Sequence, residues 1–351
     1  MHIDVNKVYK EVMSIKEELK HRTLVLDGAM GTMIQRYKLT EQDYRGNQFA
    51  DWPDDLKGNN DLLCLTQPAI IEQIHREYLE AGADILETNT FNATSISMAD
   101  YGMQEYVYDI NLAAAQIAKK AAVEFTKKNP EQPRFVAGAI GPTNKTTSLS
   151  PDVNNPAYRS VSFDEMKAAY YEQAEALLEG GVDVFLVETI FDTLNAKAAL
   201  LALEELFENK NRKIPVMISG TITDNSGRTL SGQTVKAFFA SLTHIDLLSI
   251  GFNCSLGADQ MRPYLAELSH HSHLPVSVYP NAGLPNQFGE YDESPEKMGS
   301  YIHDFLQNGF ANIVGGCCGT TPEHIAEIAR HARATQVRKV VSQDHFTHLS
   351  G

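Results

Sequence analysis

Basic residues are scarce in this chain, and long apolar runs are absent. The 351 residues include 30 Lys and Arg against 45 Asp and Glu, which gives a formal net charge of −15. Nucleic-acid phosphates and anionic lipid surfaces both bind to basic patches, so this charge argues against both as partners. No apolar run approaches the roughly 20 residues that a membrane-spanning helix needs. These absences indicate an ordinary soluble globular chain, and its 43% of hydrophobic residues can form a large core.

Cysteine is sparse as well, and the sequence contains no Cys-x-x-Cys motif. Four cysteines in a chain of this length do not form a disulfide scaffold, so a reducing, cytoplasmic setting is expected. The N-terminus also lacks the pattern of a signal peptide. Apolar residues recur there at helical spacing among Lys and Glu, at Val5, Val8, Val12, Ile15 and Leu19. This pattern predicts an extra N-terminal helix that docks on the domain.

One pattern occurs three times along the chain: a helix, a glycine and then an apolar strand. Its copies are "EYLEAGADILETNTF" at 77–91, "ALLEGGVDVFLVETIF" at 176–191 and "FLQNGFANIVGG" at 305–316. In each copy the glycine can take the left-handed conformation that ends a helix. The apolar run after it is unbroken, which is typical of a strand in a parallel sheet that helices cover on both faces.

Eight apolar runs of this kind alternate with helical patterns. They begin at Thr23, Ala83, Arg134, Val182, Pro215, Asp246, Pro275 and Ala311. Eight strands alternating with helices predict a single α/β domain of the (β/α)8 TIM-barrel class. The rival is a doubly wound open sheet, which usually has about six strands, and no Gly-x-Gly-x-x-Gly motif follows the first run here. The barrel is therefore the favoured fold.

Polar residues concentrate where the predicted strands end, which in this kind of barrel is the face that carries the active site. They are Asp27, Glu87, Asn89, Thr143, Asn144, Glu188, Thr221, Thr223, Asn253, Cys254, Asn281, Cys317 and Cys318. Three of the four cysteines share this face. Only one strand separates the sixth from the eighth, so Cys254 can meet the pair Cys317 and Cys318 over the barrel mouth.

The neighbouring Cys317 and Cys318 allow more than one interpretation. They could be small buried apolar residues, or a strained disulfide between neighbours. Flanking glycines, however, let both side chains face one point, whereas successive side chains of a regular strand point in opposite directions. Three converging thiolates in a reducing compartment favour Zn²⁺, and three protein ligands are typical of a catalytic zinc site with a fourth position open to substrate. Cys64 is expected to be a core residue, and the histidines at 270, 271 and 273 should lie in a solvated loop at the opposite end.

Six segments identify a family resemblance. They are "LVLDGAMGTMIQ", "GPTNKTTSLSPDVNNPAYR", "MISGTITDNSGRTLSGQT", "GFNCSLGADQMR", "NAGLPNQFGEYD" and "VGGCCGTTPEHI". Together they resemble the homocysteine-binding module of cobalamin-dependent methionine synthase, almost from end to end of the chain. The wider family of zinc-dependent homocysteine S-methyltransferases, which includes enzymes that use betaine or S-methylmethionine, shares the single Cys and the Gly-Gly-Cys-Cys pair. The resemblance implies a barrel in which Cys254, Cys317 and Cys318 hold zinc and the sulfur of homocysteine is the incoming ligand.

The amino-acid end of homocysteine also needs partners. Asp27 and Glu188 are carboxylates at strand ends that can accept hydrogen bonds from the substrate ammonium, and the resemblance supports this role. Gly28 and Ala29 could offer backbone N–H groups to the substrate carboxylate. An Asp at such a turn could instead cap the next helix. Glu87 stands in the equivalent place after the second strand, where it could bind substrate or orient other groups. Asn281 is suggested as the occupant of zinc's open position in the absence of substrate.

The expected domain organisation is a homocysteine-binding barrel over residues 1–337 and a polar tail over 338–351, the start of a linker to further domains. Methylcobalamin, derived from 5-methyltetrahydrofolate, is expected as the methyl donor, bound on folate and cobalamin domains outside this chain or on a separate partner. The sequence has no cobalamin-type Asp-x-His-x-x-Gly motif of its own. Two alternatives stay open: a stand-alone methyltransferase that uses betaine or S-methylmethionine, and a zinc-stabilised scaffold that binds thiols without catalysis.

Overall fold

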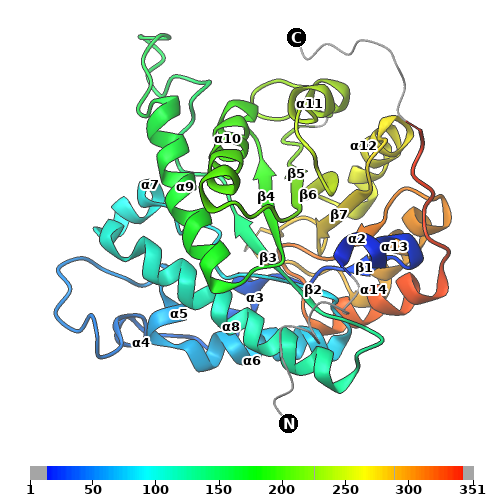
Figure 1. Cartoon of the computed structure of the whole chain (residues 1–351), viewed down its shortest axis with the longest axis horizontal. Coiled ribbons are helices and arrows are strands. Elements are labelled where there is room, and N and C mark those ends of the chain that lie inside the picture. Colours follow the sequence, from blue (N-terminus) through cyan, green and yellow to red (C-terminus); the bar gives the residue numbers. More distant parts are fainter. Residues whose placement is uncertain (1–13, 225, 288, 343–351) are drawn as a thin grey trace.

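Eight parallel strands form a nearly closed barrel in the computed structural model, which describes residues 14–224, 226–287 and 289–342 (Figure 1). The strands are β1 (Leu24–Val25), β2 (Ile85–Glu87), β3 (Phe135–Ile140), β4 (Val184–Ile190), β5 (Val216–Gly220), β6 (Ser249–Gly257), β7 (Val276–Asn281) and β8 (Ile313–Val314). The strands from β2 to β8 pair in chain order, and β8 pairs back onto β1. The remaining seam, between β1 and β2, is joined at Leu26 and Ile85. The (β/α)8 class predicted from sequence is confirmed.

A helix follows each strand and covers the outside of the sheet (Figure 1). The helices are α6 (Pro68–Ala81), α8 (Val107–Lys128), α9 (Phe163–Gly180), α10 (Thr193–Lys210), α11 (Val235–Leu242), α12 (Ala258–His271), α13 (Pro295–Gln307) and α14 (Pro322–Ala334). Shorter helices lie in the first two connections: α3 (Met30–Arg36), α4 (Glu41–Arg45), α5 (Leu63–Thr66), α7 (Ser95–Met98), η1 (Ala99–Tyr101) and η2 (Gln104–Tyr106). Within the described residues, no helix has the length and apolarity that crossing a bilayer requires.

The glycines of the repeated pattern end helices as the sequence predicts. Gly82 and Gly181 are the C-caps of α6 and α9, with φ of 108° and 93°, and Gly309 follows α13 with φ of 65°. These angles lie in the left-handed region, which costs little for a residue without a Cβ atom. Crowding adds a second reason at position 82, where a Cβ atom would lie 2.7 Å from the guanidinium of Arg333.

Two apolar clusters make up the core. The larger lies between the sheet and the surrounding helices, and the smaller fills the barrel interior with residues such as Leu24, Val184 and Met217. Ile15 and Leu19 belong to the interior cluster although they precede the barrel. They lie on α2 (Ile15–His21), which packs its apolar face against the amino ends of the strands. This helix is the described part of the predicted N-terminal helix, and positions 1–13 lie outside the described residues.

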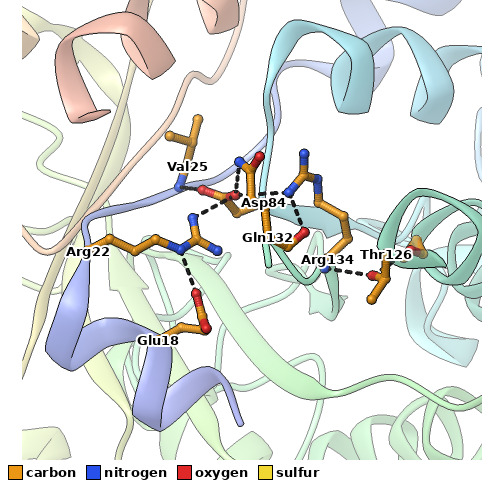
Figure 2. Close-up of polar contacts among 8 residues, drawn as sticks. Glu18, Arg22, Val25, Asp84, Thr126, Gln132 and Arg134 are labelled. Carbon is orange, nitrogen blue, oxygen red and sulfur yellow. Dashed lines mark hydrogen bonds and ion pairs between the residues drawn. The ribbon is translucent and has the colours of Figure 1, made fainter. Parts of the chain in front are cut away.

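A buried ionic network ties α2 to the amino ends of β1 and β2 (Figure 2). Asp84 is 2% exposed and accepts from the Val25 N–H at 3.0 Å. The same carboxylate lies 2.8 Å from an Arg22 nitrogen and 3.4 Å from an Arg134 nitrogen. Arg22 in turn contacts Glu18 of α2 at 2.5 Å. One carboxylate therefore holds two guanidinium groups and one backbone donor at the end of the barrel away from the predicted active site.

The proposed boundary at residue 337 falls just before an anchored side chain. Arg338 is buried and donates to the carbonyl oxygens of Ser269, Ser272 and Leu274, at 2.7, 3.1 and 3.2 Å. The first residue of the predicted tail therefore packs against the barrel. The division at 337 and 338 stays a prediction, and residues 343–351 lie outside the described part of the chain.

Asp84→Ala should lower the free energy of unfolding by about 3–5 kcal/mol, because it leaves the buried Arg134 guanidinium without its carboxylate and Arg22 with Glu18 alone. Urea unfolding monitored by circular dichroism measures this change. The matched control is Asp246→Ala, since that carboxylate is 61% exposed and pairs with Lys16 and Lys213 only at the surface. The control should change stability by about 1 kcal/mol or less. Equal effects of the two substitutions would contradict a structural role for the Asp84 network.

Candidate active site and metal centre

Three cysteines lie together at the carboxyl ends of the strands. Cys254 belongs to β6, and Cys317 and Cys318 follow β8. Their sulfur atoms all lie within 4.8 Å of one another, and the Sγ atoms of Cys254 and Cys318 are 3.9 Å apart. This is the only group of three or more metal-type ligands found among the described residues. The structure thus brings together the three thiols that the sequence places on one rim.

Backbone and amide hydrogen bonds hold the Cys317–Cys318 loop. The Cys317 N–H donates to the carbonyl of Pro280 at 2.8 Å, and the Cys318 N–H donates to Oδ1 of Asn281 at 3.0 Å. Asn281 is buried, and its side-chain oxygen holds the loop through this hydrogen bond. Gly319 has φ of 80°, and a Cβ atom there would lie 2.2 Å from the Cβ of Tyr291. The irregular backbone beyond β8 is what lets two neighbouring cysteines face one point.

Two residues of the site, Cys254 and Thr189, have an unusual backbone conformation. Cys254 has φ of 57° and Thr189, next to Glu188, has φ of 52°. Positive φ is uncommon for residues other than glycine, and for a β-branched residue it is an outlier that often marks a functional site. Asn253 is fully buried and links these two positions: it accepts from the Thr189 N–H at 3.1 Å and donates to the Thr189 hydroxyl at 2.8 Å. The register of β4 and of β6 shifts at these positions.

A cavity of about 750 Å³ opens over the three sulfurs. Of the rim residues predicted from sequence, Asp27, Glu87, Asn89, Glu188, Cys254, Cys317 and Cys318 line it. Thr143, Asn144, Thr221 and Thr223 do not, although they also follow strands. The wall residues that the sequence did not single out include the buried Asp61, Tyr279 of β7 and Tyr291 of the loop after it. Tyr279 is the one aromatic in the strand motif "SVYPN", but nothing in the sequence around Tyr291 distinguishes it.

Four carboxyl groups on the wall of this cavity are buried or partly buried, those of Asp27, Asp61, Glu87 and Glu188. Asp27 and Glu188 are 3% and 4% exposed, and Glu87 is partly buried. The Glu87 N–H donates to Asp27 Oδ2 at 3.1 Å, whereas Asp27 Oδ1 is buried without a hydrogen-bond partner among the described residues. Burial raises the pKa of Glu188 to about 8, and the nearby Cys254 sulfur adds to this rise. Burial also raises the pKa of Asp27 well above its usual range.

The turn after β1 is crowded and partly committed to internal hydrogen bonds. A Cβ atom at Gly28 would lie 2.7 Å from the Tyr78 ring, so only glycine fits there. The Ala29 N–H donates to the Thr320 hydroxyl at 3.1 Å, and the Tyr78 hydroxyl donates to the Ala29 carbonyl at the same distance. Both Gly28 and Ala29 line the cavity. The Ala29 N–H predicted for a substrate carboxylate therefore already has an acceptor, which sequence reasoning did not foresee.

Hydrogen bonds between the sulfurs distribute their charge unevenly. Contacts with the Cys254 and Cys317 thiols lower the pKa of Cys318 to about 3, and the Tyr291 hydroxyl adds to this effect. The same contacts raise the pKa of Cys317 well above its usual range. One thiolate is thus stabilised by two thiols. Ionising all three at once requires a cation in their midst, because like charges at this distance repel strongly.

The donor set fits a tetrahedral thiolate metal. Zinc–sulfur bonds of about 2.3 Å place neighbouring sulfurs about 3.8 Å apart. The Cys254–Cys318 separation of 3.9 Å matches that spacing. Cys64 takes no part in the cluster: its buried thiol donates to the Asn89 carbonyl at 3.7 Å, and burial raises its pKa. The core role predicted for Cys64 agrees with this position.

Comparison with known proteins identifies the family. The sequence model of the family described as homocysteine S-methyltransferase matches residues 24–332. Among solved structures, the metallated form of the homocysteine methyltransferase MmuM from Escherichia coli is 25% identical with a TM-score of 0.67, over 89% of this chain and 96% of that one. The oxidized form of MmuM is 24% identical with a TM-score of 0.67, over 88% and 95%. This chain belongs to the homocysteine S-methyltransferase family.

Proposed function

We propose that this protein binds homocysteine as a thiolate and presents it for S-methylation to methionine, with methylcobalamin on a separate domain or partner protein as the methyl donor. One observation carries the proposal: three cysteine sulfurs and buried carboxyl groups line the same cavity. The sulfurs suit the reacting end of homocysteine, and the carboxyl groups suit its ammonium end. A simple structural metal site would not need an open cavity with acids on its wall.

Zinc is the proposed metal, held by Cys254, Cys317 and Cys318. When bound, it lowers the pKa of an approaching thiol, which otherwise stays mostly protonated at neutral pH because its pKa is about 8.5. The family match and a relative known in a metallated form support a metal at this position. The chain's own residues set the position of the substrate sulfur, because the loop after β8 and the left-handed Cys254 point all three ligands at one place.

The substrate ammonium is proposed to bind between Asp27 and Glu188. Asp27 Oδ1 is buried without a partner among the described residues, which is costly unless a ligand supplies the hydrogen bond. Glu188 faces the same cavity from β4. For the substrate carboxylate we propose the backbone at Gly28 and Ala29, where the chain turns into α3. Because the Ala29 N–H already donates to Thr320, the Gly28 N–H is the better placed of the two to bind the carboxylate.

Exposed apolar side chains on the loops at the carboxyl ends of the strands support delivery of the methyl group by a large partner. They occur on several loops that follow the strands, at Phe91, Leu149, Val153, Leu230 and Leu284, and Phe91 also lines the cavity. Val153 is 90% exposed on the connection between β3 and α9, which projects from the body of the molecule (Figure 1). Apolar side chains around a binding cavity are typical of a protein–protein contact. A corrin-bearing domain seated on this rim would face the sulfurs.

A second candidate is a stand-alone homocysteine methyltransferase that uses S-methylmethionine or betaine. It is favoured by the match to MmuM, of which this chain covers 96%. The two candidates share the thiolate site and differ only in the donor. A third reading, a zinc-bearing scaffold that binds thiols without catalysis, has the same metal site and no methyl transfer.

Methyl transfer from a defined donor separates these candidates. Zinc-loaded protein with homocysteine should form methionine when methylcobalamin is supplied, and little or none with S-methylmethionine or betaine. Chromatography of methionine gives the readout, and protein stripped of metal with a chelator is the control. Turnover with S-methylmethionine or betaine alone would establish the second candidate, and no methionine from any donor would favour the scaffold.

Zinc content tests the ligand assignment. Cys254→Ser, Cys317→Ser and Cys318→Ser should each lose most of the bound zinc, because each removes one of three thiolate ligands. Cys64→Ser should keep one zinc per chain, as its sulfur lies outside the cluster. Elemental analysis measures the content. The barrel should stay folded without metal because its core is large, and circular dichroism checks this. Full zinc retention in the Cys317 variant would disprove the assignment.

Substrate binding tests the two carboxylates. Asp27→Asn and Glu188→Gln should each keep zinc and weaken homocysteine binding about ten- to a hundredfold, since each removes a charge-assisted hydrogen bond of roughly 1.5–3 kcal/mol. Isothermal titration calorimetry measures the affinity. A simple alkyl thiol without an amino group serves as the control ligand and should respond little to either change. Wild-type affinity for homocysteine in both variants would show that the carboxylates are structural.

A further inference from the structure

One fully buried amide joins three neighbouring strands at the end of the barrel that carries the cavity. Asn253 lies on β6, Ser219 on β5 and Thr189 on β4, and the first two are 0% exposed. Asn253 Oδ1 accepts from the Thr189 N–H at 3.1 Å and from the Ser219 hydroxyl at 2.7 Å. Its Nδ2 donates to the Thr189 hydroxyl at 2.8 Å. Because β5 lies between β4 and β6 in the sheet, this side chain reaches across a whole strand.

The direction of these hydrogen bonds follows from the partners. A backbone N–H can only donate, so the atom that faces the Thr189 nitrogen is the amide oxygen, and the amide NH2 group faces the Thr189 hydroxyl. A reversed amide would set two donors against each other. Asn253 thus holds Thr189 by its backbone and by its side chain at once, which requires a side chain with both a donor and an acceptor.

Thr189 needs such a hold because its backbone conformation is costly. Its φ of 52° is unfavourable for a β-branched residue, and a conformation of this kind persists only where the surrounding structure enforces it. The register between β4 and β5 shifts at this place, between Val187 and Ile190, so regular strand pairing does not fix it. The two hydrogen bonds between Asn253 and Thr189 supply the enforcement.

The chain neighbours of this clamp belong to the two ends of the candidate site. Glu188 directly precedes Thr189, Cys254 directly follows Asn253, and both Glu188 and Cys254 line the cavity. Release of Thr189 from the left-handed region would turn the chain at Glu188 and move its carboxyl group. The Thr189 hydroxyl lies 3.5 Å from Glu188 Oε2, a long contact that adds little to the hold. The separation between the Glu188 carboxyl group and the Cys254 sulfur therefore depends on one amide.

We propose that Asn253 is a positioning residue that sets the place of Glu188 relative to the Cys254 sulfur, so that the site matches the length of an amino-acid thiol. It acts through the backbone of Thr189. The inference rests on the proposed function, in which homocysteine binds with its sulfur at the cysteines and its ammonium at the carboxyl groups. A fixed spacing lets both ends bind at once, whereas a simple thiol uses the sulfur end alone. The expected signature of the clamp is selectivity for homocysteine over a simple thiol.

Dissociation constants of homocysteine and of a simple alkyl thiol, measured by calorimetry on zinc-loaded protein, test the inference, and their ratio is the readout. Asn253→Ala should weaken homocysteine binding about tenfold and change binding of the simple thiol about twofold or less. The matched control is Ser219→Ala, which removes a bond to the same amide oxygen but leaves both bonds between Asn253 and Thr189. This control should keep the ratio of the parent protein.

A double variant shows whether Asn253 acts through Glu188. In protein that carries Glu188→Ala, the further change Asn253→Ala should alter homocysteine affinity about twofold or less, because the group that the amide positions is gone. Equal losses in both backgrounds would overturn the inference, since they would show an amide that only supports the fold. Elemental analysis should find one zinc per chain in Asn253→Ala. Loss of zinc would also overturn the inference, because the amide would then serve the metal ligand rather than Glu188.

Variants of Thr189 decide the matter if Asn253→Ala does not fold. Thr189→Val removes the acceptor of the amide NH2 group at nearly constant shape and should lower the ratio about threefold or more. Thr189→Ser keeps the hydroxyl and should stay close to the parent. A parent-like ratio in Thr189→Val, or in folded Asn253→Ala, would refute the inference alone and leave the proposed function intact. Failure of the parent protein itself to bind homocysteine would refute both.

Discussion

Burial of negative charge in one barrel mouth is the constraint on which this structure depends. Three thiols and four buried or partly buried carboxyl groups line one cavity, in which solvent screens them poorly. The protein meets this constraint in separate ways at the two ends of the site. Contacts with the Cys254 and Cys317 thiols lower the pKa of Cys318 at one end, and burial raises the pKa of the Asp27, Glu87 and Glu188 carboxyl groups at the other. The remaining charge suits a divalent metal and an ammonium group, which are the two cations that the proposed reaction brings in.

Strain in the scaffold is concentrated where these charges meet. Cys254 and Thr189 both have positive φ, and the buried Asn253 amide bridges their strands. These contacts couple the proposed metal end of the cavity to the proposed ammonium end through one side chain. A shift of β6 would therefore move a sulfur and the support of Glu188 together. Such coupling suits a substrate that must be gripped at its sulfur and its amino group at once.

The buried ionic network and the candidate active site lie at opposite ends of the barrel. The amino ends of the strands are closed by α2 and by the Asp84 network, in which Arg22 and Arg134 both pair with the Asp84 carboxylate. The carboxyl ends keep unpartnered atoms, such as Asp27 Oδ1 and the Tyr279 hydroxyl. An unsatisfied buried carboxylate oxygen is costly in a folded protein, and Asp27 Oδ1 lies on the face where a barrel of this class binds ligands.

The sequence by itself determined the barrel, because helix, glycine and apolar strand follow local rules of period and capping that need no distant contact. It also determined that Cys254, Cys317, Asp27 and Glu188 share one rim, since parallel strands end on the same face. Tertiary structure decided the rest. The engagement of the Ala29 N–H by Thr320, and the contact of Asn253 with Thr189, depend on loop paths and positive φ angles that no local pattern encodes. Strand order determines which residues are neighbours, but only the packed loops determine which atoms touch.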